Sequence, residues 1–201
     1  MVASKDKKND DALSSFLTVA KSGVKKAGES LKTMSASAIR LEVISAGIAP
    51  TSRLSEVAGN PEDLMIGVYI GVSGEMPGHA LLIFPYESAL LLVDMITGSP
   101  LGSTKHVDDM EMSVLQEVGN IVTASYLGAF SDFYRCVLLP SPPSLAIDMA
   151  AAVIDSVLLN TGCFEEDTIS VVTKFAGAKR SLRGFFMYIP ELVSAPVEEA
   201  A

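Results

Sequence analysis

The sequence lacks the features that mark nucleic-acid-binding proteins. Its 201 residues include 15 Lys and Arg against 24 Asp and Glu, which gives a net charge of -9. No stretch combines clustered basic residues with interleaved aromatic residues. A nucleic-acid partner is therefore not expected, because such a partner requires a basic surface.

Long hydrophobic runs are absent as well. The mean hydropathy is +0.37, but each apolar run is interrupted well before the roughly 20 residues that a spanning helix needs. The N-terminus has no apolar core of a secretory signal, and there are only two cysteines, Cys136 and Cys163. We therefore expect a cytoplasmic protein with no membrane partner, in which both thiols fill the core.

Metal-binding and nucleotide-binding patterns are missing too. His79 and His106 are the only histidines, and neither has a second histidine four residues on or a cysteine pair nearby. A zinc site or a Cys-His nucleophile is unsupported. The stretch "GVSGEMPG" lies between two expected strands, so it reads as a turn and not as a phosphate-binding loop.

The chain has 49% hydrophobic and 19% charged residues, which suits one well-filled domain or two small fused halves. Apolar spacing predicts two similar series of elements. The first series is a helix at 11–33, a strand at 38–48, a hairpin at 64–84 and a short helix at 89–96. The second is a helix at 107–130, a strand at 134–139, a helix from 141 to 159 and a hairpin at 168–189.

The two series indicate an internal duplication. The hairpins end similarly, in "GHALLIFP" and "RGFFMYIP". We expect an α/β protein of the α+β type, with pseudo-two-fold symmetry, antiparallel strands and long helices packed on the sheet. Residues 1–201 would form one domain of two intertwined repeats, at about 11–98 and 107–190. Residues 1–10 and 193–201 are expected to be flexible.

The stretch "SVLQEVGN" places three polar residues on a largely apolar helix. At about 100° per residue, Ser113, Glu117 and Asn120 fall within an arc of about 60°. Two interpretations remain open on spacing alone. The three residues form either the solvated face of an amphipathic helix or a functional ridge.

The distance to a later proline adds information, because 22 residues separate Asn120 from Pro143. The order Ser, three residues, Glu, two residues, Asn, 22 residues, Pro resembles the signature of the CheC, CheX and FliY phosphatases of chemotaxis. The segments "GVYIGVSGEMPGHALLIFP", "EVGNIVTASYLGAFSD" and "PSPPSLAIDMAAAVIDSVL" also resemble CheC, in the same order. The resemblance covers most of residues 64–189.

The resemblance implies a hydrolase that removes phosphate from the phosphoaspartate of a CheY-type response regulator. Asn120 would hold the attacking water, and Glu117 would pair with the regulator's lysine. Ser113 would support Glu117 or the partner, and Pro143 would begin the next helix beside Asn120. The regulator would supply Mg²⁺, so no metal or cofactor of the chain's own is expected. Such chemistry needs mainly positioning and charge neutralisation.

No Glu, two residues, Asn triplet stands in the first long helix, so the first repeat lacks the motif. Setting the two long helices side by side places Phe16 opposite Glu117 and Val19 opposite Asn120, which leaves one active site. The family resemblance also implies the deamidase CheD as a second partner. Asp148, on the expected helix after Pro143, is our candidate for that contact. The alternative is a non-catalytic adaptor that binds a response regulator or CheD.

Overall fold

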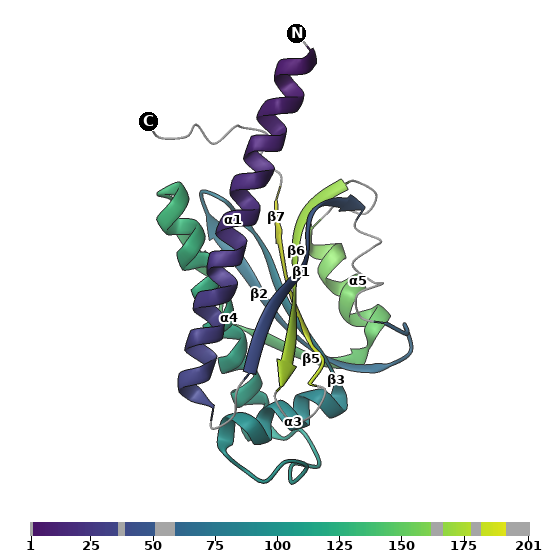
Figure 1. Ribbon diagram of the computed structural model, residues 1–201. Coiled ribbons are helices and arrows are strands. Elements are labelled where there is room, and N and C mark those ends of the chain that lie inside the picture. The colour runs from purple at the N-terminus through teal and green to yellow at the C-terminus, as the bar shows by residue number, and fades with distance from the viewer. Residues whose placement is uncertain (1, 36–38, 51–58, 162–166, 178–181, 192–201) are drawn as a thin grey trace.

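The computed structural model describes residues 2–35, 39–50, 59–161, 167–177 and 182–191. Figure 1 shows two long helices on one side of a curled sheet and a shorter helix on the other. The elements in chain order are α1 (Val2–Met34), β1 (Ile39–Pro50), β2 (Leu64–Gly74), β3 (Gly78–Pro85), α3 (Tyr86–Thr97), α4 (Asp109–Tyr134), β4 (Leu138–Pro140), β5 (Ser144–Met149), α5 (Ala150–Thr161), β6 (Asp167–Gly177) and β7 (Phe185–Pro190).

The strands form one seven-stranded antiparallel sheet in the order β1-β6-β7-β3-β2-β4, with β5 also paired to β2. The hairpins β2–β3 and β6–β7 meet at the centre, where Leu82 lies opposite Phe186. Strand β1 of the first half pairs with β6, and β5 of the second half pairs with β2. Each half therefore completes the sheet of the other, and the order has the same pattern from either end.

Two hydrophobic cores lie on the two faces of the sheet. The larger core joins α1, α3 and α4 to one face and is rich in aromatic contacts, such as the Phe16 and Phe130 rings at 5.0 Å. The smaller core joins α5 to the other face through Val153, Ile154 and Val157. Because successive side chains of a strand point to opposite faces, strands β2, β3 and β7 contribute to both cores.

The predicted α+β class with antiparallel strands is confirmed, and so are both hairpins. The short helix α3 ends at Gly98 as expected, with the glycine in the left-handed conformation. Helix α1 begins at Val2, so residues 2–10 are helical where we expected a flexible start. Residues 193–201 lie outside the described part of the chain. The boundaries of the two repeats stay a prediction.

One predicted helix is wrong at its start. We expected a helix from residue 141, but residues Ser144–Met149 form strand β5 and the helix begins only at Ala150. The apolar residues Leu145, Ile147 and Met149 alternate with polar or small ones, and β2 offers an edge for pairing. The strand expected at 134–139 shrinks to β4, because α4 continues to Tyr134 before the left-handed Arg135 ends it.

No helix among the described residues is long and apolar enough to cross a membrane.

The loop that leads into α4 is held by a buried carboxylate. Asp94 of α3 is fully buried. Its oxygens accept hydrogen bonds from the backbone N–H groups of Gly102, Ser103 and Thr104 and from both side-chain hydroxyls, at 3.0 Å for Ser103 and 2.6 Å for Thr104. Burial alone would raise the pKa of Asp94, but these hydrogen bonds outweigh it and lower the pKa below the ordinary value of 3.8. The ionised carboxylate therefore anchors this loop.

We expect Asp94→Ala to reduce the free energy of unfolding by about 3 kcal/mol at neutral pH, because several buried donors lose their acceptor. A lowered pKa means that the carboxylate's contribution is present above the unfolded-state pKa and is lost as the pH falls through the folded-state pKa. The difference in the free energy of unfolding between variant and wild type should therefore narrow in acid. Urea unfolding at a series of pH values measures this difference. Asp155→Ala, at an exposed position of α5, is the control and should stay within about 0.5 kcal/mol of wild type.

Candidate functional site

Helix α4 is positioned by both of its ends and by its apolar face. A capping box between Asp108 and Glu111 begins the helix, with the Asp108 N–H donating to Glu111 Oε2 at 3.1 Å. The buried face packs on the sheet and on α1, where Ser30 and Ser125 hydroxyls lie 3.2 Å apart. The buried residues of α4 are Leu115, Val118, Gly119, Val122, Thr123, Tyr126, Leu127, Ala129 and Phe130.

Gly119 marks the point where α4 comes closest to the sheet. A Cβ atom at this position would lie 2.8 Å from Val68 Cγ1 and 3.6 Å from Ile70 Cδ1, both on β2. The shorter distance is below any ordinary carbon–carbon contact, so only glycine lets the helix approach this closely. The glycine of the motif therefore serves the packing beneath the site, while Glu117 and Asn120 lie on the side facing solvent.

The three polar residues of the motif lie on the outer side of α4. Glu117 and Ser113 are exposed, and Asn120 is half-buried. Asn120 Nδ2 lies 3.5 Å from Glu117 Oε2, at the long limit of a hydrogen bond. The two groups are therefore adjacent but only weakly engaged with each other. Both remain available to a ligand.

Ser113 contributes less than the motif suggests. Its hydroxyl donates to the carbonyl of Asp109, one turn earlier, at 2.8 Å. This is a common arrangement for serine on a helix surface. Ser113 makes no contact with Glu117 here, so it extends the polar ridge without orienting the carboxylate.

Pro143 lies beside the ridge but does not begin a helix. It precedes strand β5, and its carbonyl accepts a hydrogen bond from Gln116 Nε2 at 3.2 Å. Gln116 thus joins the β4–β5 connection to α4 directly next to Glu117. Sequence reasoning overlooked Gln116, and the only signal for it was its place at the border between the ridge and the apolar face of the helix.

Asp148 is exposed, as expected, but it lies on β5 opposite Met65 and not on a helix. Its Oδ1 accepts a hydrogen bond from the Met149 N–H at 2.8 Å. On the α4 side of the same strand pair, three large apolar side chains are exposed: Leu64 at 50%, Ile147 at 39% and Met149 at 51%. The sheet edge beside the ridge is therefore an apolar surface, the kind that partner proteins cover.

The charge around the ridge is negative. Helix α4 carries no Lys or Arg between its ends, and its charged residues are Asp109, Glu111, Glu117 and Asp132. Over the described residues, no group of three or more His, Cys, Asp or Glu side chains could hold a metal ion. That Mg²⁺ comes from the partner stays a prediction.

The two histidines do not form a second site with each other. His79 is buried, and its Nδ1 shares a hydrogen bond with the Tyr69 hydroxyl at 2.8 Å. Burial lowers the pKa of His79, and the nearby carboxylate of Glu191 opposes this only in part. His79 is thus a neutral structural residue near pH 7, whereas His106 is exposed.

Comparison with known proteins shows what the segment around the ridge is similar to. The profile of the CheC-like family matches residues 110–147, which span the ridge, Gln116 and Pro143. The CheY-P phosphatase CheC of Bacillus subtilis (strain 168) is 27% identical over 157 residues, which cover 76% of this chain and 75% of that protein. Over residues 110–147 the chain is therefore similar to the CheC-like family.

Solved structures show that the CheC-like chain shares its fold with proteins of differing partners. Thermotoga maritima FliY matches with a TM-score of 0.67 at 15% identity, over 86% of each chain. FliM from a Helicobacter pylori FliG–FliM complex matches with a TM-score of 0.64 at 16% identity, over 91% of this chain and 94% of that chain. CheX from a Borrelia burgdorferi CheX–CheY–BeF3–Mg²⁺ complex matches with a TM-score of 0.56 at 15% identity, over 86% of this chain and 97% of that chain.

The proposed pairing of the two long helices in this CheC-like chain is wrong. Phe16 and Val19 are 5% and 3% exposed, whereas Glu117 is exposed, so these positions face different surroundings. Adding 99 to each residue number instead superposes every position of residues 14–34 that is buried on a buried position of α4. The pairs are Phe16 and Leu115, Val19 and Val118, Ala20 and Gly119, Gly23 and Val122, Val24 and Thr123, Ala27 and Tyr126, and Leu31 and Phe130.

This superposition gives the ridge a new counterpart on α1. Ser14 takes the place of Ser113, Thr18 that of Glu117 and Lys21 that of Asn120, and all three are exposed. Helix α1 therefore presents an equivalent outer face without the carboxylate and without the carboxamide.

We expect Gly119→Ala to lower the free energy of unfolding by about 1–3 kcal/mol, because the added methyl group overlaps Val68 and must push α4 outward. Urea unfolding measures the loss. Gly128→Ala is the matched control on the same helix, since nothing lies within 4 Å of its Cβ position. It should leave stability unchanged or raise it by up to about 1 kcal/mol. Equal behaviour of the two variants would contradict the close approach of α4 to β2.

Proposed function

We propose that this CheC-like chain is an aspartyl-phosphate phosphatase that acts on a CheY-type response regulator, with one active site on α4. The observation that carries the proposal is the adjacent pair of the exposed Glu117 and the half-buried Asn120 on the outer side of α4, beside the segment at Pro143. The name of the Bacillus subtilis relative and the CheX–CheY complex among the structural matches support the choice of partner.

Asn120 is suited to place the attacking water. A carboxamide can accept a hydrogen bond from a water and donate one as well, and it brings no negative charge toward the phosphoryl group. Its Nδ2 is held only weakly by Glu117 at 3.5 Å, so the amide can turn toward a docked substrate. Phosphoryl transfer through a loose transition state needs such positioning more than it needs a strong base.

Glu117 would bind a cation of the partner. Its carboxylate would repel an anionic phosphoryl group if nothing stood between them, whereas a lysine of the regulator would pair with it and bring the two proteins into register. The Mg²⁺ that neutralises the phosphoryl group would also come from the regulator. The chain's own contribution is then a helix face with two side chains.

The apolar sheet edge next to α4 would supply much of the docking contact. Leu64, Ile147 and Met149 are exposed on the same side of the sheet as α4. A few well-packed side chains near the centre of an interface contribute most of the binding energy. Asp148, on the opposite side of β5, remains our candidate for contact with CheD. With such partners, the proposal implies a cytoplasmic protein.

A non-catalytic adaptor is the second candidate. Two observations favour it: the loss of both reactive groups on the outer face of α1, and the fold shared with FliM from a FliG–FliM complex. The two functions differ in whether phosphate is released from the regulator.

Loss of phosphate from radiolabelled CheY-P in the presence of Mg²⁺ tests the proposal. Wild type should accelerate the loss over the regulator's own rate, and Glu117→Ala and Asn120→Ala should each reduce the acceleration by about 10²-fold. Glu87→Ala removes an exposed carboxylate from α3 and should retain full activity. Binding of the regulator without any acceleration by wild type, with and without CheD, would establish the adaptor instead.

A further inference from the structure

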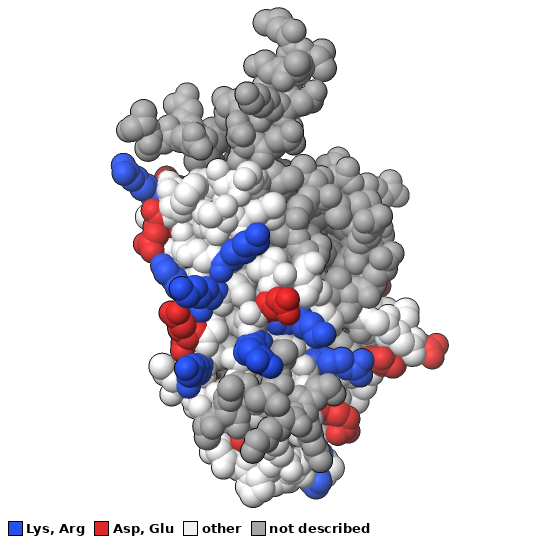
Figure 2. All heavy atoms as spheres, in the orientation of Figure 1, with Lys and Arg blue, Asp and Glu red and all other residues white. Residues whose placement is uncertain are grey.

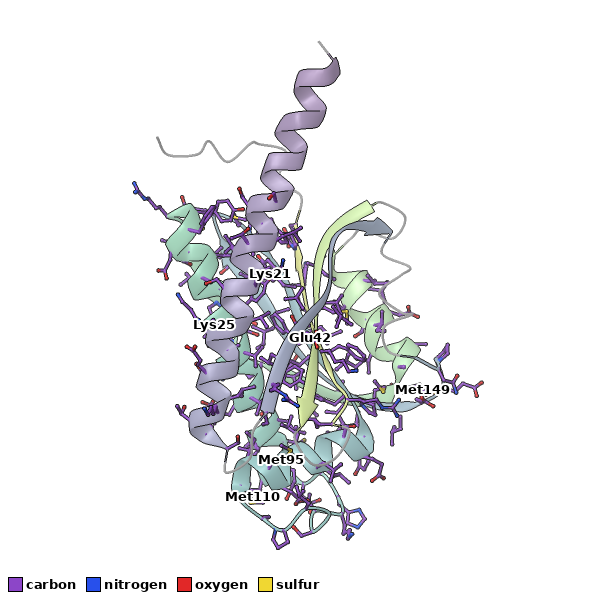
Figure 3. The ribbon with its side chains drawn as sticks, viewed as in Figure 1. Lys21, Lys25, Glu42, Met95, Met110 and Met149 are labelled. Atoms are coloured by element: carbon purple, nitrogen blue, oxygen red, sulfur yellow. The ribbon has the colours of Figure 1, made fainter. Side chains whose placement is uncertain are left out.

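The outer flank of α1 is a basic surface on an acidic protein. Lys21, Lys25 and Lys32 are exposed and fall within an arc of about 40° on this helix. Figure 2 shows basic side chains gathered on this side of the molecule, and Figure 3 labels Lys21 and Lys25 along α1. Arg40 of β1 and Lys174 of β6 are exposed as well, but on the other face of the sheet, because Ile39, Leu41 and Phe175 point into the core beneath α1. We call Lys21, Lys25 and Lys32 the basic face.

Few carboxylates neutralise the basic face. Glu29 lies on α1, whereas Glu42, labelled in Figure 3, lies on β1 directly opposite Lys174, on the other face of the sheet. Within the described residues, no member of the basic face comes within 4 Å of a carboxylate. By contrast, Lys26 on the other flank of α1 pairs with Asp132 of α4 at 2.9 Å.

Such an arrangement is unfavourable for the isolated helix. Lysines four residues apart, such as Lys21 and Lys25, repel each other along the same side of a helix. An anionic partner would remove this repulsion and gain charge-assisted hydrogen bonds.

The basic face is also the structural counterpart of the catalytic ridge. The superposition of the buried faces of α1 and α4 sets Lys21 at the position of Asn120 and Thr18 at that of Glu117. The neighbouring strands correspond too, because β1 and β5 are the outer strands that follow the two long helices and pair with β6 and β2. The fold therefore presents two similar helix-and-strand surfaces with opposite charge.

We infer that the basic face is a second docking site for the phosphorylated response regulator, one that binds the phosphoryl group without hydrolysing it. The inference rests on the proposed function, from which it takes the partner. Where Asn120 would hold a water, Lys21 places an ammonium group, which binds phosphoryl oxygens as a compact point charge. Thr18 lacks the carboxylate that would pair with the regulator's lysine. The first face thus retains attraction for the anion but has no group that orients a water.

Both faces are accessible at the same time. The flank of α1 that faces α4 is the one that carries Lys26 and Ser30. Lys21, Lys25 and Lys32 lie on the opposite flank, next to β1. The ridge likewise lies away from the flank of α4 that contacts α1 through Ser125 and Asp132. One chain should therefore bind two regulators.

Titration calorimetry with CheY activated by beryllofluoride and Mg²⁺ tests the inference. Wild type should bind two regulators per chain, and Lys21→Glu/Lys25→Glu should weaken one of the two sites at least about tenfold. Glu117→Arg should remove the other site. Lys26→Glu, which changes the charge of the inner flank of α1, should leave two sites. CheY without beryllofluoride should lose the site at the basic face, because the anion that Lys21 binds is missing.

A phosphate-release assay on the same wild-type preparation separates this inference from the proposed function. If wild type hydrolysed CheY-P yet bound only one regulator, with an affinity that Lys21→Glu/Lys25→Glu does not change, that result would overturn the inference and leave the phosphatase intact. Absence of hydrolysis together with one bound regulator that is lost in Lys21→Glu/Lys25→Glu would overturn the phosphatase and keep the docking site. If Lys26→Glu weakened regulator binding as much as Lys21→Glu/Lys25→Glu does, the docking site would also be overturned. General electrostatic attraction would then explain the binding without a specific site.

Discussion

The exchange of strands between the two halves of the chain is the constraint on which the rest of the molecule depends. Strand β1 completes the sheet beside β6, and β5 completes it beside β2. Neither half can satisfy the backbone hydrogen bonds of its own hairpin edge without the other. The same exchange brings α1 and α4 side by side on one face of the sheet and turns their outer flanks in different directions.

Close packing on this frame decides how the candidate site is presented. Gly119 lets α4 lie directly on Val68, which fixes the rotation of the helix and turns Glu117 and Asn120 outward. Gln116 then ties the segment at Pro143 to the same helix turn. A rigid element with two outward groups is a suitable design for chemistry in which the partner brings the metal, the lysine and the phosphoryl group, since placement is then the chain's main task.

The two long helices have opposite electrostatic character on their solvent sides. Helix α4 has four carboxylates and no basic residue, whereas the outer flank of α1 has three lysines and neither reactive group. Both helices bury the same seven positions, so the difference is confined to the solvent side. Surface residues contribute little to stability, which leaves these flanks free to acquire different binding properties while the core is retained.

The sequence by itself determined the helices, the hairpins, the antiparallel α+β class and the outward ridge at Ser113, Glu117 and Asn120, because each depends on periodicity within a short window. Tertiary structure alone decided that residues 144–149 form a strand, since their pairing partner on β2 lies some 80 residues earlier.

The tertiary structure also decided how the repeats correspond. Aligned letter by letter, "GHALLIFP" and "RGFFMYIP" equate Leu81 with Phe186, yet these residues lie in different cores. A shift of one residue reverses the faces of a strand, and a shift of two exchanges the inner and outer sides of a helix. Only the packed structure selects the register, and with it the residue of α1 that corresponds to each residue of the ridge on α4.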